Sequence, residues 1–134
     1  MRKAMTAVVA LTAMMLTMGC QEKLEDRAER ECREQTEKNC PTPVENFASM
    51  DSMTFERSTH TIVHHYSVYD RADDSLAFVG KEEEMHRELA KVMANTTEGR
   101  IYKDAGYNYR FIYRSHKDPQ RILYSTDITP KDYK

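Results

Sequence analysis

The chain has 134 residues, with 20 basic and 22 acidic side chains and a formal net charge of −2. This length supports one domain with a substantial core but not two independent cores. The slightly acidic balance argues against a nucleic-acid-binding domain, which is usually strongly basic.

The amino terminus has the layout of a secretory signal peptide over residues 1–19. Arg2 and Lys3 precede an uncharged apolar stretch that ends at Gly19 and Cys20. A membrane-spanning helix needs about 20 apolar residues, so this stretch is too short for a permanent span. Because two of the 20 basic residues lie in the signal, the predicted mature chain keeps 18 basic against 22 acidic residues.

The small residue followed by cysteine at the end of this stretch resembles the lipobox of bacterial lipoproteins. The resemblance covers residues 2–20 and implies that the signal is cut before Cys20, whose thiol then carries a diacylglyceryl group. It also implies acylation of the new amino terminus, by a fatty acid such as palmitate. Two or three acyl chains anchor a protein stably, so the membrane would be one partner of this chain. By the sorting rules of enteric bacteria, Gln21 favours the outer membrane. The alternative is ordinary cleavage after Gly19, which would release a soluble protein into the envelope.

A densely charged helix is predicted over residues 22–38, where acidic residues precede basic ones at the spacing that stabilises helices. Its apolar stripe is only Leu24, Ala28 and Cys32. A stripe this narrow leaves open whether the helix packs on the domain or forms a solvated spacer beside the lipid. We therefore assign residues 20–43 to lipid attachment and the charged helix or spacer, and residues 44–134 to the folded domain.

Cys32 and Cys40 are the pair left once Cys20 is lipidated, and an exported protein can oxidise them. Eight residues of unbroken helix would separate their Cα atoms by about 12 Å, whereas a disulfide tolerates less than about 7 Å. The disulfide therefore requires that the helix ends before about residue 37. Two separate thiols are the alternative.

Two hairpins are predicted from apolar and aromatic residues at every second position. The first has a turn near residues 57–58, and the second has a turn near residues 117–119. Between the hairpins, residues 82–95 have helical periodicity, with Met85, Leu89, Val92 and Met93 on one face.

The predicted fold class is therefore α+β, in the order helix, hairpin, helix, hairpin. We expect a four-stranded antiparallel sheet with one or two helices on one face, and the pattern leaves the strand order open. Two-layer folds of this kind resemble cystatins and small bacterial protease or lactamase inhibitors, which are mostly binding modules. This is an analogy at the level of the fold.

No local motif predicts catalysis, a metal site or a cofactor. His60, His64 and His65 attract notice, but strand residues four apart lie about 13 Å from each other and cannot share one ion. His65 points to the face opposite His64. We expect His64 to fill an aromatic slot in the core face.

The last hairpin is the one basic region, since residues 99–134 have 8 basic and 4 acidic residues. Arg110 and Arg114 alternate with the aromatic face, and Arg121 lies near the turn. An arginine-rich strand face can bind an anionic partner, whether a phosphate, an acidic glycan or an acidic protein. The alternative is that these arginines meet water or the protein's own acidic residues.

Taken together, the sequence predicts a small envelope lipoprotein, anchored through Cys20, whose domain binds a partner and does not catalyse a reaction. The alternative is a structural accessory subunit of an outer-membrane or periplasmic complex.

Overall fold

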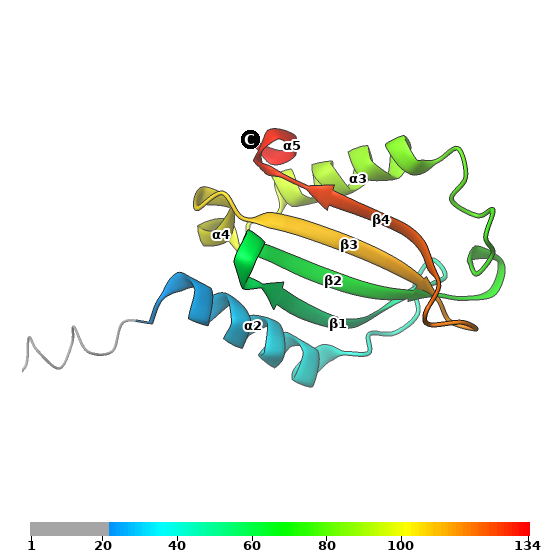
Figure 1. The fold of residues 1–134 in the computed structure, drawn as a ribbon, viewed down its shortest axis with the longest axis horizontal. Coiled ribbons are helices and arrows are strands. Elements are labelled where there is room, and N and C mark those ends of the chain that lie inside the picture. Colours follow the sequence, from blue (N-terminus) through cyan, green and yellow to red (C-terminus); the bar gives the residue numbers. More distant parts are fainter. Residues whose placement is uncertain (1–21) are drawn as a thin grey trace, which may run out of the picture.

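The structure is a computed structural model that describes residues 22–134, and Figure 1 shows its fold. The predicted signal peptide and Cys20 lie outside the described residues. Within residues 22–134, no helix has the length and apolar character needed to cross a membrane. The fold therefore concerns the part of the chain that follows the predicted anchor.

Four strands form a single sheet in the order β1-β2-β3-β4, which confirms the α+β fold class (Figure 1). The strands are β1 (Ala48–Glu56), β2 (Thr61–Val68), β3 (Asn108–Ser115) and β4 (Ile122–Ile128). Both predicted hairpins are present as antiparallel pairs, β1 with β2 and β3 with β4.

The expectation of a wholly antiparallel sheet needs one correction, because the central strands β2 and β3 are parallel. Ile62 lies beside Tyr109 and Tyr66 beside Tyr113 in this pair. Parallel neighbours need a long crossover connection. The segment between them supplies it with α3 (Glu82–Asn95) and α4 (Arg100–Asp104), which return the chain to the end of the sheet where β2 begins.

The first helix, α2 (Leu24–Asn39), packs against the sheet along β1, so its predicted stripe does contribute to the core. Ala28 is 1% exposed and Cys32 is 4% exposed. The hydroxyl of Thr36 also pairs with the edge of β1, since it accepts the N–H of Met53 at 2.9 Å and donates to the carbonyl of Met53 at 3.1 Å. The first helix is therefore an integral wall of the folded unit.

Arg57, in the 3₁₀ turn η1 (Arg57–Thr59) between β1 and β2, holds the other end of α2. Its guanidinium contacts the carboxylates of Glu25, Asp26 and Glu29 on the helix. These groups are close to half exposed, so each pair contributes little by itself. The Thr36 contacts near one end of α2 and the Arg57 contacts near the other end therefore fix the helix at two points along its length.

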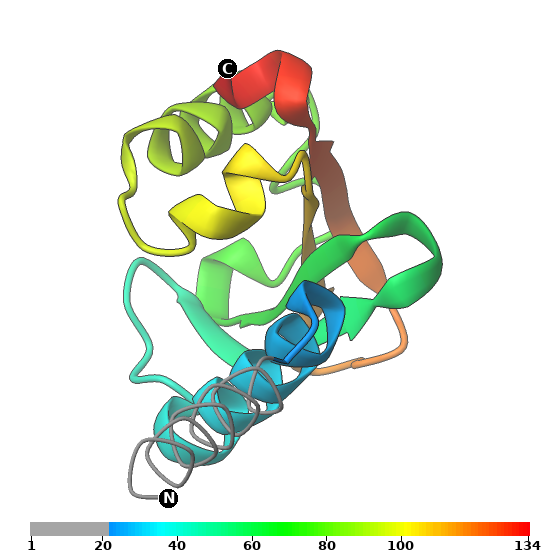
Figure 2. The ribbon, with the colours of Figure 1, turned by 90° about the vertical axis from the view of Figure 1, so that its left-hand side faces the viewer.

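The helices α2, α3 and α4 cover the same face of the sheet (Figures 1 and 2). In Figure 1, α2 follows the β1 side of this face and α3 follows the β4 side. Met93 is the buried residue of α3, whereas Val92 is 59% exposed, so its predicted place in the buried stripe is wrong. The face of α3 that packs on the core includes the partly buried His86 and Ala90 and leaves Val92 outside it.

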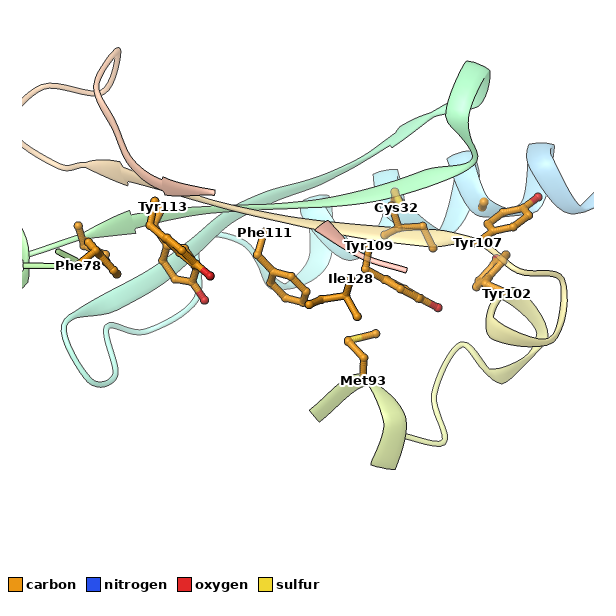
Figure 3. Packing of buried hydrophobic residues seen from close by; sticks show 13 residues of the cluster. Cys32, Phe78, Met93, Tyr102, Tyr107, Tyr109, Phe111, Tyr113 and Ile128 are labelled. Atoms are coloured by element: carbon orange, nitrogen blue, oxygen red, sulfur yellow. The ribbon is translucent and has the colours of Figure 1, made fainter. Parts of the chain in front are cut away.

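The core between sheet and helices is mainly aromatic (Figure 3). On β3, Tyr109, Phe111 and Tyr113 point into it, as the period-two pattern predicts. Tyr102 is only 4% exposed because the short helix α4 turns it inward. The last helix, α5 (Pro130–Tyr133), adds Tyr133, which packs edge-on against Tyr109.

Candidate functional site

A groove of about 590 Å³ lies over the core face of the sheet, between α2 and the α3–α4 segment. We call it the α2–α3 groove. Its floor comes from β1, β2 and β3, and its two walls come from the helices. The residues that define it are Ala28, Glu31, Cys32, Glu34, Gln35, Lys38, Met50, Met53, Ile62, His64, Tyr66, Met93, Thr96, Glu98, Gly99, Tyr102 and Tyr109.

The floor is apolar and adaptable, because aromatic rings and methionine side chains form most of it. Met50 and Met53 lie on the β1 side, and Met93 faces them from α3. Methionine has a flexible, polarisable side chain that adjusts to differently shaped apolar partners. Such a floor suits a ligand that presents apolar side chains.

Two polar atoms at the groove have no hydrogen-bond partner within residues 22–134, and both are buried. They are His64 Nδ1 and the hydroxyl oxygen of Tyr109. Buried Tyr hydroxyls and imidazole nitrogens are normally hydrogen-bonded, because an unpaired buried polar group is costly. Their position in the lining of a groove makes them candidates for ligand contact.

His64 is held neutral by its surroundings. Its ring stacks on Phe111, with centroids 4.6 Å apart, which confirms the aromatic slot predicted from the sequence. Burial lowers the pKa of His64 to about 4. At neutral pH it therefore offers an uncharged ring with one donor and one acceptor nitrogen.

The ends of the groove walls are fixed by hydrogen bonds between elements. The hydroxyl of Tyr102 donates to Glu31 at 2.7 Å, which ties α4 to α2. The ammonium of Lys103 donates to the carbonyls of Met93 and Thr96 and so caps the end of α3. These contacts fix the positions of the two walls relative to each other at one end of the groove.

Two of the charged residues that line the groove form ion pairs with arginines, and the other two do not. Glu31 pairs with Arg27, and Glu34 pairs with Arg30, both along α2. Lys38 and Glu98 make no ion pair within the described chain. The groove therefore has one uncompensated cation and one uncompensated anion.

These two charges lie toward opposite ends of the groove. Lys38 is in the last turn of α2, before the segment that pairs with Met50, and Met50 lies beside Tyr66. Glu98 immediately precedes Gly99, where an added Cβ would lie 3.8 Å from the Tyr109 hydroxyl. Tyr109 is paired with Ile62, four residues from Tyr66 along β2.

The three arginines singled out in the sequence are not part of this groove. Arg110 lies on the opposite face of the sheet, where its guanidinium contacts Asp127 at 2.8 Å and Glu56 at 3.2 Å. Arg114 donates to His65 Nδ1 at 3.0 Å, and Arg121 is exposed in the turn before β4. An anionic partner at this face would compete with the protein's own carboxylates for Arg110.

Cys32 and Cys40 are free thiols in the structure. The helix between them continues to Asn39, so the condition that the sequence set for a disulfide is not met. Burial raises the pKa of the Cys32 thiol to about 11, which leaves it protonated and unreactive at neutral pH. Cys32 therefore serves as an apolar part of the groove wall formed by α2.

The histidines also separate as the strand geometry predicts. His60 stacks on Tyr107 at the turn, and His65 hydrogen-bonds Thr54 on the opposite face from His64. Among residues 22–134 there is no group of three or more side chains that could hold a metal ion. Cys20, the predicted lipid attachment residue, lies outside the described residues.

The sequence did not indicate the groove, because its residues come from separate elements whose arrangement depends on the parallel β2–β3 crossover. Tyr102 and Glu98 belong to a short connection with no periodic pattern of its own. Strand alternation does place the floor residues Met53, Ile62, His64, Tyr66 and Tyr109 on one face of their strands, but it does not show which helices face them.

The chain belongs to the family described as "Domain of unknown function (DUF8479)", whose profile matches residues 23–124. A search of curated proteins finds no match. The match begins at the start of α2, so the family domain includes the helix that forms one wall of the groove.

Three solved structures share the fold at low sequence identity. A candidate secreted protein from Pseudomonas aeruginosa has a TM-score of 0.66 at 10% identity, covering 85% of this chain and all of the other. The type II secretion system pilotin AspS from Vibrio cholerae has a TM-score of 0.58 at 16% identity, covering 81% of this chain and 91% of AspS. The pilotin EpsS from the Vibrio vulnificus type 2 secretion system has a TM-score of 0.63 at 12% identity, covering 83% of this chain and 92% of EpsS. These similarities establish the fold alone.

Proposed function

We propose that this chain is a non-catalytic accessory protein of the bacterial cell envelope that acts like a pilotin of a secretion system. In this proposal it holds a segment of a partner protein in the α2–α3 groove, and the lipid on Cys20 anchors it to the outer membrane. The single observation that carries the proposal is an open groove with an apolar floor, in a fold that two type II secretion system pilotins share.

The groove is better suited to binding than to chemistry. The only groove histidine, His64, is packed in the floor with its pKa lowered to about 4, so it makes a poor general base. Glu31 and Glu34 are paired with arginines, and Cys32 is a protonated thiol. The lining thus offers apolar contact and a few hydrogen bonds, which is typical of a recognition site.

The charged face of the last hairpin is the weaker candidate for the partner surface. Arg110 is engaged by two carboxylates of the neighbouring strands, which neutralises much of its charge. This arrangement supports the view that the basic face stabilises the sheet, and it leaves the groove as the candidate surface.

The test is capture of partners from the detergent-solubilised envelope by the full-length native protein and two variants. Gln35→Trp places a large side chain on the groove wall, whereas Arg33→Trp places the same side chain elsewhere on the same helix. We expect the wild type and Arg33→Trp to retain the same partner and Gln35→Trp to lose at least tenfold of it. Equal capture by both variants, with both folded by circular dichroism, would refute the groove as the binding site.

A further inference from the structure

The two edges of the sheet differ in how their outward backbone groups are satisfied. At the β1 edge, the hydroxyl of Thr36 bonds the N–H and the carbonyl of Met53, and Thr42 pairs with Met50. The protein's own residues thus occupy the outward groups of this edge. An edge strand without such cover can pair with another extended chain.

The direction of the β3 backbone decides which groups of the other edge strand, β4, point outward. The N–H of Asn108 donates to the carbonyl of His60 at 2.9 Å, so the even-numbered residues of β3 bond β2. The N–H of Ser115 donates to the carbonyl of Arg121 at 3.0 Å, so the odd-numbered residues of β3 bond β4. Backbone groups along β3 therefore alternate between its two neighbours.

The register then shows that β4 has an open edge. Odd-numbered residues of β3 pair with even-numbered residues of β4, as in Phe111 with Thr126. Ser125 and Asp127 lie between those even-numbered residues, so their N–H and C=O groups point away from the sheet. Both residues are exposed, and no hydrogen bond within residues 22–134 involves these backbone groups.

A ledge of about 460 Å³ runs along this edge, and we call it the β4 ledge. It is lined by residues 122–126 of β4 and by Glu82, Glu83 and His86 of α3. Figure 1 shows α3 alongside β4, with α5 at the carboxy-terminal end of the strand. A side chain fixes α3 to the strand, since His86 Nδ1 lies 2.7 Å from the hydroxyl of Thr126. The helix therefore forms one side of the ledge without using the backbone groups of the edge.

The lining of the β4 ledge indicates which side chains its occupant carries. Glu82 and Glu83 are exposed and form no ion pair within residues 22–134. Ile122, in the same lining, is 52% exposed. A segment with basic side chains toward α3 and an apolar side chain at Ile122 complements both features.

An extended chain suits the β4 ledge better than a helix or a second copy of this protein. A strand supplies partners for the backbone groups of Ser125 and Asp127, whereas the backbone groups of a helix are bonded internally. A second copy would bring its own α3 and α5 to the shared edge. Because both helices flank β4, they would meet those of the first copy.

We propose that the β4 ledge binds an extended segment of a partner protein, which adds to the sheet as a fifth strand and places basic side chains at Glu82 and Glu83. A segment of about five residues matches the part of β4 that lines the ledge. The β4 ledge and the α2–α3 groove share no lining residue, so this inference does not rest on the proposed function.

Hydrogen exchange measured by NMR on the full-length protein in detergent tests the open edge. We expect the amides of Ser125 and Asp127 to exchange fast and those of Tyr124 and Thr126 to exchange slowly. A short peptide of alternating lysine and valine should slow exchange at Ser125 and Asp127 about tenfold or more. The same peptide with N-methylated amides keeps its side chains but donates no backbone hydrogen bond, so it should leave these rates unchanged.

Variants of the full-length protein test the contacts by fluorescence anisotropy with the lysine–valine peptide. Ser125→Pro removes an outward N–H, which an edge strand tolerates, and should weaken binding about tenfold or more. Ser125→Thr keeps this N–H and is the matched control. Glu82→Lys combined with Glu83→Lys should weaken binding about 3- to 10-fold. Glu84→Lys, in the same turn but outside the ledge lining, should change it by less than about twofold.

Four results would overturn the fifth strand. They are no binding of the lysine–valine peptide, equal binding of its N-methylated form, unchanged affinity of the folded Ser125→Pro variant, and unchanged affinity of the Glu82 and Glu83 double variant. Protection of Ser125 that grows with protein concentration, without peptide, would show that a second copy occupies the edge. Gln35→Trp, on the wall of the α2–α3 groove, should bind the peptide as the wild type does, and a loss there would place the peptide in that groove.

Discussion

Tyr102 of α4 donates a hydrogen bond to Glu31 of α2 at 2.7 Å, and this contact joins the two walls of the groove at one end. Burial alone raises the pKa of Glu31, but hydrogen bonds from Arg27 and Tyr102 outweigh it, so its pKa lies below the usual value. The contact is therefore strongest while Glu31 is ionised.

Tyr102→Phe removes this hydrogen bond and should lower the free energy of unfolding by about 1 kcal/mol at neutral pH. A carboxyl whose pKa is depressed by folding stabilises the protein above its unfolded pKa and loses that contribution as the pH falls through its folded pKa. The penalty should therefore shrink as the pH falls below the ordinary value of 4.5. Urea unfolding of the wild type and of Tyr102→Phe, at neutral pH and at a pH below 4.5, measures this difference in the free energy of unfolding. Tyr69→Phe is the control, and an equal loss there would contradict the assignment.

His64 makes the stability of the protein change with pH in the mildly acidic range. Its pKa is lowered from 6.5 to about 4 by burial, so the unfolded chain takes up a proton before the folded protein does. Stability should therefore be complete above pH 6.5 and fall between pH 6.5 and about 4, by up to roughly 3 kcal/mol. His64→Phe should flatten this part of the pH profile in thermal unfolding. His116→Phe, at an exposed position, should keep it. A wild-type profile that is flat over this window would show that His64 titrates normally.

Thr36 replaces a strand partner at the edge of β1, because its hydroxyl accepts the N–H of Met53 and shares its proton between the carbonyls of Met53 and Cys32. Thr36→Val keeps the shape of the side chain but leaves these groups of Met53 unpaired. We expect a loss of about 1 to 3 kcal/mol in urea unfolding, since an unsatisfied buried polar group costs about that much. Thr97→Val, an exposed change, should lie within about 0.5 kcal/mol of the wild type. Similar values for the two variants would contradict the edge-pairing role.

The thiols of Cys32 and Cys40 should differ in reactivity. Cys32 is 4% exposed with its pKa raised to about 11, whereas Cys40 is partly exposed at the end of the helix. Iodoacetamide should label Cys40 of the folded protein well before Cys32. When the protein is unfolded without a reductant, iodoacetamide should label both cysteines. Peptide mass mapping reads this directly. A peptide linked through Cys32 and Cys40 in the unreduced protein would show that the disulfide considered from the sequence does form.

Local patterns predicted the elements well but not their arrangement. Strand alternation placed His64, Tyr109 and Phe111 on the core face, and charge spacing located the helix that contains Cys32. The parallel pairing of β2 with β3 depends on a crossover of almost forty residues that includes α3 and α4, and no local pattern encodes the return of such a segment. The groove follows from that crossover, because it brings Glu98 and Tyr102 opposite α2.

The basic face also shows that local patterns predict the face on which a residue lies but not its partners. Alternation correctly set Arg110 and Arg114 apart from the core, but their partners are determined by register. Asp127 lies beside Arg110 on β4, and Glu56 reaches it from β1. Cross-strand partners at such separations in sequence cannot be assigned before the strand order is known.

The most direct test of the central claim is site-specific photocrosslinking in living cells from Gln35, in the groove, compared with Arg33, outside the groove lining on the same helix. We predict that benzoylphenylalanine at position 35 yields one covalent adduct with a single envelope protein, and that position 33 yields none of it. If position 33 gives the same adduct at equal yield, or if position 35 gives no protein adduct, the α2–α3 groove is not the surface through which this chain binds a partner.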